Sequence, residues 1–322
     1  MSLIDAIMNK DISRIKKLIA YGLDPNCTFV GDTSFLGGSA LNDINVFETL
    51  LKNGANPNYV DKDGDCVLYS MARRTANIRF YELMVKYGVD LHEIHGSCGN
   101  TLGNLSFILK YGSRGYEVLK FLLANGADPH VRANNGNTIL IDLLRRRILV
   151  NGMEFVNLLI DQYKVDVNAK NDLGHTALMV AIRAQLEPYI RRLFEAGANP
   201  YMEDAKHVTP LMHACNHYKA DTLKLLLDLN VNINANNSEG KTVLDYAIAE
   251  KRFKLVKFLL DHGAVANNKI DPPNTSYEIV QELFQRGIIT SMEGAVETPS
   301  ETFDDDNELD YTPQYWGDIC LF

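Results

Sequence analysis

Long apolar runs, a cysteine framework and a secretion signal are all missing from this 322-residue chain. No stretch reaches the roughly 18 consecutive apolar residues that a membrane-spanning helix needs, so no such helix is predicted. The five cysteines are scattered and odd in number, which argues against a set of disulfides. The first residues lack the charged and then apolar pattern of a secretory signal. These absences predict a folded protein in a reducing location, cytoplasmic or otherwise intracellular.

Recognisable catalytic motifs are missing as well. The sequence contains no P-loop, G-x-S-x-G, H-E-x-x-H or paired C-x-x-C pattern. His213 and His217 are four residues apart on an expected helix, but no further ligand accompanies them. His92, His95 and Cys98 form a second loose group whose spacing matches no structural zinc pattern. We therefore predict no catalytic residue, no metal and no cofactor, and an enzyme remains only a distant alternative.

Net charge is close to zero in most of the chain. Residues 291–322 contain nine acidic residues and no Lys or Arg, whereas residues 1–290 contain 32 acidic and 32 basic residues. A neutral body argues against attraction of the whole molecule to nucleic acid, although a local basic patch is compatible with it.

An internal repeat is the main positive feature of the sequence. A small residue that can open a helix recurs at intervals of 33 to 38 residues, at Thr33, Cys66, Thr101, Thr138, Thr176, Thr209 and Thr242. In most units a Leu pair follows about fifteen residues later, and a glycine comes shortly after it. Repeats of this length are typical of stacked supersecondary units.

Each unit is predicted to form two short helices followed by a turn. The Thr209 hydroxyl can cap the first helix, and Leu223, Leu226 and Leu227 form one apolar stripe on the second. Glycine after the second helix supplies the left-handed residue that ends it. The polar segment Asp61–Asp65, with a glycine at a turn position, predicts a hairpin-like finger between units.

These units resemble ankyrin repeats. The segments G-H-T-A-L-M-V-A (174–181) and T-P-L-M-H-A (209–214) are similar to the family pattern G-x-T-P-L-H-x-A, and G-A-D-P (126–129) is similar to its closing part. The resemblance runs from about Leu3 to about Gly287. It implies an all-α solenoid of helix-turn-helix units with hairpin fingers over residues 1–290. Within it we expect an N-cap at 1–28, about seven repeats at 29–268 and a C-cap at 269–290, followed by a disordered acidic tail at 291–322.

Three departures from the family pattern affect the register. The third repeat has Leu102-Gly103 where Pro-Leu is expected and carries an insertion near residues 111–115, and the fourth is lengthened around residues 147–152. His207 occupies a position where the finger normally has glycine, which would cost about 1 kcal/mol in a left-handed conformation.

The resemblance also implies the function, which is protein binding by an adaptor or inhibitor. Family members hold partners with finger tips and with exposed residues late in each first helix. By register, the partner-binding positions are Arg73, Arg74, Arg145, Arg146, Arg183 and His217 on the helices, with His175 and Lys206 at the tips. Stacking of the repeats would align the arginines, and aligned like charges repel one another unless an acidic partner binds to them. The alternative interpretation is an ordinary solvated helix face.

The acidic tail adds a second candidate surface. Tyr311, Tyr315 and Trp316 are interleaved with carboxylates, a pattern typical of segments that fold on binding, and the alternative is a tail without a partner. We expect a protein partner with an acidic surface for the helix face, and no membrane. A nucleic-acid binder or mimic is the second hypothesis. A role in host–pathogen conflict, in a host cell, follows only from analogy with stand-alone bacterial and viral family members.

Overall fold

The computed structural model describes residues 2–26, 40, 43–61, 64–92, 106–133, 135–145, 152–216, 220–267 and 275–293. Two compact units divide the chain, Met1–Val243 and Leu244–Phe322, and each is described by itself. The predicted opener residues Thr33 and Thr101 and the tail beyond Glu293 lie outside the described residues.

The first unit consists of short helices, and most of them occur in pairs. Their bounds are α1 (Leu3–Met8), α2 (Ile12–Ala20), α3 (Ile44–Lys52), α4 (Val67–Arg74), α5 (Ile78–Lys86), the 3₁₀ helix η2 (Ser106–Tyr111), α7 (Ser113–Ala124), α8 (Ile139–Arg145), α9 (Gly152–Asn157), η3 (Leu158–Gln162), α10 (Ala177–Arg183), α11 (Glu187–Glu195), α12 (Pro210–Asn216) and α13 (Ala220–Asp228). The prediction of an all-helical repeat fold is confirmed.

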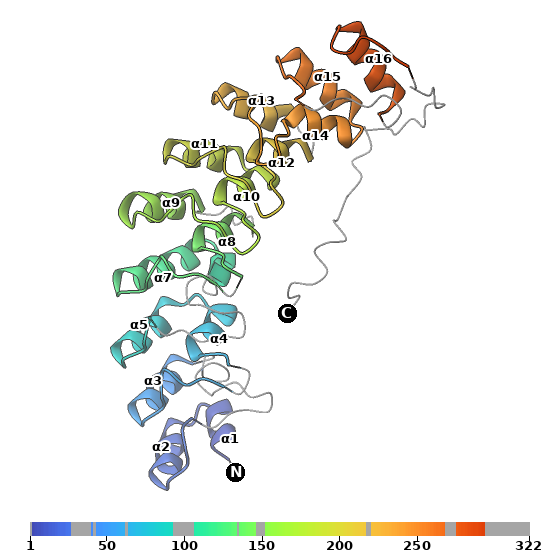
Figure 1. The fold of residues 1–322 in the computed structure, drawn as a ribbon. Helices are drawn as coiled ribbons and strands as arrows, with labels where there is room; N and C mark the ends of the chain where they lie inside the picture. The colour runs from blue at the N-terminus through green and yellow to red at the C-terminus, as the bar shows by residue number, and fades with distance from the viewer. Residues whose placement is uncertain are drawn as a thin grey trace. The chain divides into compact units, whose positions relative to one another are not determined.

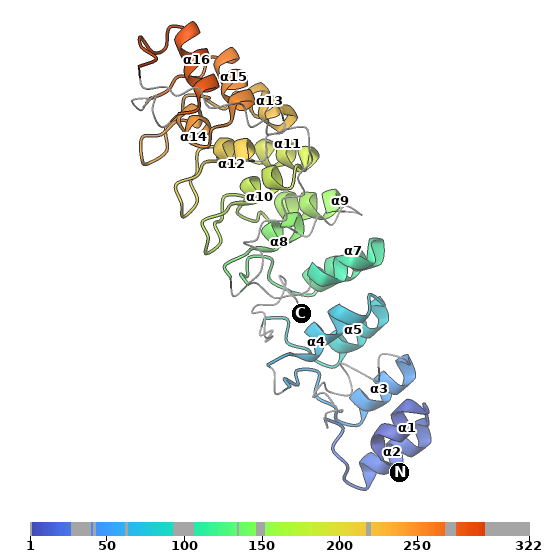
Figure 2. The same cartoon turned by 90° about the vertical axis from the view of Figure 1, so that its right-hand side faces the viewer.

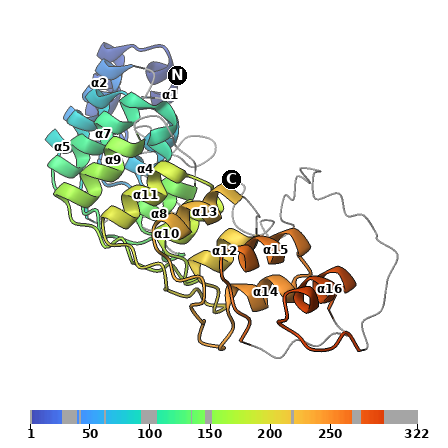
Figure 3. The same cartoon turned by 90° about the horizontal axis from the view of Figure 1, so that it is seen from above.

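The helices of the first unit form two layers (Figure 1). First helices contact one another in the order α4, η2, α8, α10 and α12, while second helices contact in the order α2, α3, α5 and α7. Figure 3 shows α5, α7, α9 and α11 side by side in the second layer. Residues at the same repeat position therefore lie in rows along each layer.

Local sequence signals fix where the helices begin. The Thr176 and Thr209 hydroxyls accept hydrogen bonds from the N–H groups of Met179 and Met212, each at 3.3 Å. Cys66 does the same with sulfur, since its Sγ accepts from the Tyr69 N–H at 3.4 Å. These contacts satisfy N–H groups that the first turn of a helix leaves without a partner.

Left-handed residues end the second helices, as predicted. The glycines after these helices have φ values between +80° and +101° at Gly54, Gly88, Gly126 and Gly197. Asn230 takes this conformation in its repeat, with φ of +58°. The fourth repeat uses Lys164 (φ +54°), directly after the irregular π-helical turn η3, and the sequence pattern did not reveal this substitute.

Leucine side chains supply the contacts between layers. Leu50, Leu122, Leu159 and Leu226 are completely buried, as are Phe47 and Phe155. Each such side chain contributes about 1.5–3 kcal/mol relative to remaining in water. At least one leucine of each predicted pair is therefore part of the core of the stack.

Hairpin fingers connect the units, as predicted, and lie on one side of the first unit (Figure 2). The Asp61 N–H donates to the Asp65 carbonyl at 3.0 Å, and Asn171 and Asp204 make equivalent bonds to His175 and Val208. His207 has φ of +59° where other fingers have glycine, which confirms the left-handed backbone expected there.

Loops after the second helices are joined by side-chain hydrogen bonds, which we call the loop-to-loop bonds. Side-chain oxygens of one loop accept from a backbone N–H of the next: Asn26 from Asn56 (2.6 Å), Asn58 from Asp90 (2.7 Å), Asn168 from Asn199 (2.8 Å) and Tyr201 from Asn232 (3.1 Å). His92 and His130 occupy the equivalent positions in the two intervening loops, and neither makes this bond to a described residue.

The second unit contains α14 (Val243–Ala249, which begins at the last residue of the first unit), α15 (Phe253–Asp261) and α16 (Tyr277–Gln285). Helices α15 and α16 pack through buried Leu259, Ile279 and Leu283. Arg286 binds Asp261 of α15 at 2.7 Å and Glu282 of its own helix at 2.6 Å. These ion pairs fix the end of α16 against α15.

Neighbouring fingers approach closely at Gly174, and this gives a test of the stacking. Gly174 has φ of +76°, and a Cβ there would lie 2.5 Å from the Ala205 nitrogen, which donates to Leu173 at 3.0 Å. Gly240 has a similar φ of +74° but no atom within 4 Å of an added Cβ. We expect Gly240→Ala to lower the free energy of unfolding by about 1 kcal/mol, and Gly174→Ala by about 1–3 kcal/mol more. Urea unfolding followed by circular dichroism measures both, and equal losses would contradict the close approach.

Candidate functional site

Basic side chains occur at the ends of successive first helices. Arg73 and Arg74 are exposed at the end of α4, and Arg145 is exposed at the end of α8. Because α4, η2 and α8 contact in that order, these positions belong to one row of the first-helix layer. Arg146 and His217 lie outside the described residues, as do Tyr311, Tyr315 and Trp316.

Lys110 is a further member of this row that sequence reasoning missed. It is exposed near the end of η2, and its Nζ donates to the Arg73 carbonyl at 2.6 Å. The Tyr111 hydroxyl donates to the same carbonyl at 3.0 Å. The altered third repeat hid this register, because Leu102-Gly103 replaces the usual pattern ahead of it. We call Arg73, Arg74, Lys110 and Arg145 the basic row.

Members of the basic row differ in their local partners. Arg145 lies 3.4 Å from the Asp142 carboxylate, which also accepts from the Asn137 side chain at 2.8 Å. No described carboxylate lies within ion-pair distance of Arg73, Arg74 or Lys110. Their charges are therefore not compensated by the described part of the body.

Arg183 occupies the same helix position in α10, but its side chain is half-buried, whereas the basic row is exposed. Its Nη1 lies 3.5 Å from Nε2 of His175, and burial lowers the pKa of the guanidinium, although it remains charged at neutral pH. Arg183 therefore packs into the body instead of projecting with the basic row. Lys206 is exposed at the tip of the finger that contains Asp204.

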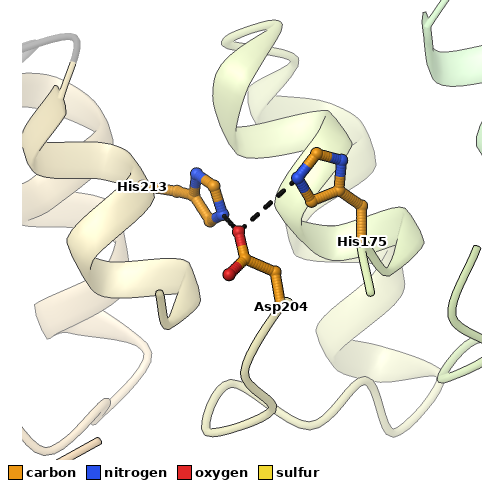
Figure 4. Close-up of side chains that lie close together, drawn as sticks. All are labelled: His175, Asp204 and His213. Carbon is orange, nitrogen blue, oxygen red and sulfur yellow. Dashed lines mark hydrogen bonds and ion pairs between the residues drawn. The ribbon is translucent and has the colours of Figure 1, made fainter. Parts of the chain in front are cut away.

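A buried cluster lies beside Arg183 and consists of His175, Asp204 and His213 (Figure 4). His213 Nε2 lies 2.8 Å from Asp204 Oδ2, and His175 Nε2 lies 3.5 Å from the same oxygen. The two imidazole rings meet edge to face with centroids 5.5 Å apart. The side chains are 15%, 4% and 8% exposed for His175, Asp204 and His213 respectively, so the histidine cluster is largely closed to water.

Finger geometry positions Asp204. Its Oδ1 accepts from the backbone N–H groups of Lys206 (2.8 Å) and Val208 (3.0 Å), which closes the finger turn. Asn171 and Asn237 make the same pair of bonds in their own fingers. The turn requires one oxygen only, so the second carboxylate oxygen of Asp204 is directed to the two histidines.

Burial and hydrogen bonding determine which groups of the histidine cluster are charged. Burial alone would raise the pKa of Asp204, but the hydrogen bonds from His175, His213 and two backbone N–H groups outweigh burial and hold it well below its usual range. Burial lowers the pKa of His213, and the opposing pull of Asp204 does not restore it. At neutral pH the cluster therefore pairs a carboxylate with a neutral His213 that donates through Nε2–H.

The histidine cluster gives His213 a partner that the sequence analysis did not name. Helical spacing relates His213 to His217, which lies outside the described residues. The structure instead directs His213 to Asp204, nine residues earlier, and to the finger of the preceding repeat. Recurrence of Asn or Asp at the finger base was the available signal for Asp204.

Comparison with known proteins identifies the family. The family model described as "Ankyrin repeats (3 copies)" matches residues 105–204 and 186–270, which together span just over half of the chain. The chain therefore belongs to the ankyrin repeat family.

Individual relatives are distant. The chain is 25% identical over 234 residues to putative ankyrin repeat protein L371 of Acanthamoeba polyphaga mimivirus, covering 70% of this chain and 29% of that protein. It is 26% identical to the mouse B-cell lymphoma 3 protein homolog, in an alignment that covers 64% of this chain and 45% of that protein. The chain thus spans less than half of the length of these curated relatives. The crystal structure of the ankyrin repeat domain of Bcl-3 matches with a TM-score of 0.59 at 21% identity, covering 70% of this chain and 98% of that one.

Within the described residues, no helix is both long enough and apolar enough to cross a lipid bilayer.

The contributions of the two Asp204 oxygens to the free energy of unfolding can be tested separately. Asp204→Ala removes the acceptors of two backbone N–H groups and two imidazoles, and we expect it to lower the free energy of unfolding by about 3 kcal/mol. Asp204→Asn keeps one oxygen for the finger turn, as in Asn171 and Asn237, so its loss should be about 1 kcal/mol. Urea unfolding measures both variants. Indistinguishable losses would show that the turn bonds contribute little.

Proposed function

We propose that this chain is a non-enzymatic protein-binding module that holds an acidic partner on its first-helix layer. Ankyrin repeats are generally protein-interaction modules, and the chain belongs to that family. The observation that supports this surface is the basic row, four exposed cations on three consecutive first helices. Lys206 is exposed at a finger tip of the same body, whereas His175, also predicted to bind the partner, is largely buried in the histidine cluster.

Uncompensated charge is the physical basis of the proposal. Arg73, Arg74 and Lys110 have no acidic partner among the described residues, and their helices are in contact, so their like charges repel. A partner carboxylate relieves this repulsion, and guanidinium groups bind carboxylates in a bidentate manner. Phosphate offers similar chemistry, so nucleic acid is the competing ligand that the experiment must distinguish.

Charge reversal tests the basic row. We expect Arg73→Glu, Arg74→Glu, Lys110→Glu and Arg145→Glu, combined in one chain, to weaken partner binding at least about tenfold while helicity persists. Arg183 stays unchanged in this variant because it is half-buried beside the histidine cluster.

A matched control carries four equal changes on second helices, at Arg79, Arg114, Lys120 and Lys224, all of which are exposed. Affinity capture followed by quantitative mass spectrometry compares the three chains, and purified partners are then titrated. An equal loss of affinity in both variants would show that the effect comes from net charge. Unchanged binding would show that the basic row is an ordinary solvated surface. A steep salt dependence with plain duplex DNA would favour nucleic acid instead.

The acidic aromatic tail forms the second part of the proposal. Residues 291–322 combine nine carboxylates with Tyr311, Tyr315 and Trp316, and no basic residue. Aromatic side chains anchor interfaces and carboxylates steer association, so we assign the tail to a second site on the partner. At its finger tip and at the end of its first helix, the repeat near the tail in sequence has Glu239 and Glu250 rather than arginines, which argues against the tail binding at these positions.

Truncation tests the tail. A chain ending at Gly294 should bind the partner more weakly, and Trp316→Ala with Tyr315→Ala should reproduce much of that loss. Titration of the purified partner against the three chains measures this. Tighter binding after truncation would show that the tail competes with the partner for the body.

The finer biological role rests on family analogy. We propose an adaptor or inhibitor acting inside cells, and a viral relative such as the mimivirus protein is compatible with a role in host–pathogen conflict. Identification of the captured partner tests this role directly.

A further inference from the structure

The histidine cluster presents three metal-ligating atoms to one point. His175 Nε2, Asp204 Oδ2 and His213 Nε2 all lie within 4.8 Å of one another. Figure 4 shows both imidazoles directed at the same carboxylate oxygen from opposite sides. The ligands come from two successive repeats, because His175 precedes α10 whereas Asp204 and His213 belong to the next finger and α12.

Hydrogen bonding alone leaves His175 Nε2 in conflict. This atom lies 3.5 Å from Arg183 Nη1, which can only donate, and 3.5 Å from the Asp204 carboxylate, which can only accept. In either tautomer, Nε2 therefore faces one neighbour with the wrong polarity. A cation between Nε2 and Oδ2 removes the conflict with the carboxylate, because both atoms then present lone pairs to it.

We propose that His175, Asp204 and His213 bind a zinc ion, with one position left for water or a small anion. Two imidazole nitrogens and one carboxylate oxygen are an established ligand type for zinc, at about 2.0–2.2 Å each. Ligand atoms around a tetrahedral zinc are then about 3.4 Å apart. The separations of 2.8 and 3.5 Å around Oδ2 are close to this value, and the two Nε2 atoms lie within 4.8 Å of one another, so the imidazoles must rotate toward each other to admit the ion.

The surroundings of the ligands suit a zinc site. Asp204 Oδ1 is held by the N–H groups of Lys206 and Val208, which orients the carboxylate as ligating carboxylates usually are. His213 Nε2 lies 2.8 Å from Asp204 Oδ2, so zinc would replace the proton shared by these two atoms. The Arg183 guanidinium, 3.5 Å from His175 Nε2, opposes the binding of a cation, whereas the Asp204 carboxylate and an anionic fourth ligand would compensate the charge of zinc.

Zinc at this position would join two repeats. The fingers and first helices of successive repeats otherwise meet through apolar packing and hydrogen bonds, such as those from the Ala205 N–H to the Leu173 carbonyl and from the Asn171 side chain to Asn137. A metal that binds only the folded arrangement raises the unfolding temperature by mass action.

Zinc titration of the full chain tests the proposal. After chelator treatment, zinc chloride is added to the intact chain and to His175→Gln, His213→Gln and His207→Gln, with binding followed by calorimetry and unfolding by circular dichroism. Glutamine can still donate to Asp204, so the two cluster variants retain a hydrogen bond while losing a ligand. His207 is the matched control, an exposed histidine of the same finger that pairs with Glu203.

We expect the intact chain and His207→Gln to bind one zinc equivalent that both cluster variants lose or bind about tenfold or more weakly. The intact chain should also gain unfolding temperature with zinc, and cobalt in its place should give the intense visible bands of a tetrahedral site. No zinc binding, or equal binding by all four chains, would overturn the proposal and leave the histidine cluster as a hydrogen-bonded contact. If one cluster variant fails to fold, the other decides.

Discussion

Each repeat depends on its neighbours because two short helices cannot enclose their own apolar faces. Leu50, Leu122, Leu159 and Leu226 become fully buried only when successive second helices pack against the first-helix layer. The same packing sets the register between repeats, since a shift by one helical position would expose these leucines. Every row of side chains in the first unit follows from this requirement.

Register converts separation in sequence into proximity in space. Lys110 reaches the carbonyl of Arg73, 37 residues earlier, and Asp204 reaches His175 from the next finger. The basic row and the histidine cluster are both consequences of this arrangement, although one is exposed and the other is closed to water. The basic row and the histidine cluster thus occupy adjacent repeats and have no residue in common.

Much of the fold could be predicted because its signals are local. Helix starts are predicted by the capping residues Thr176 and Thr209, and a helix end is predicted by Gly126, which readily adopts a left-handed backbone. The Leu pairs predict the core. Two features escaped this reasoning. Lys110 lies in a repeat whose opening pattern is altered, and Lys164 replaces glycine after a π-helical turn.

The candidate site was predictable only in part, for a physical reason. Exposed helix ends such as Arg73 and Arg145 follow directly from register. The half-burial of Arg183 and the direction of Asp204 depend on how two fingers approach each other, which spacing does not encode. His213 illustrates the difference, since helical spacing relates it to His217 whereas the finger brings it Asp204.

The loop-to-loop bonds have a mechanical consequence. Four described junctions are tied by a side-chain oxygen from Asn26, Asn58, Asn168 or Tyr201, but His92 and His130 make no such tie to the described residues. These repeats are joined by other side-chain bonds instead, such as the one from Arg132 Nη1 to the Lys170 carbonyl at 2.6 Å. Lys110 and Arg145 belong to these same repeats. A partner that binds both cations and changes their spacing would therefore break none of the four loop-to-loop bonds.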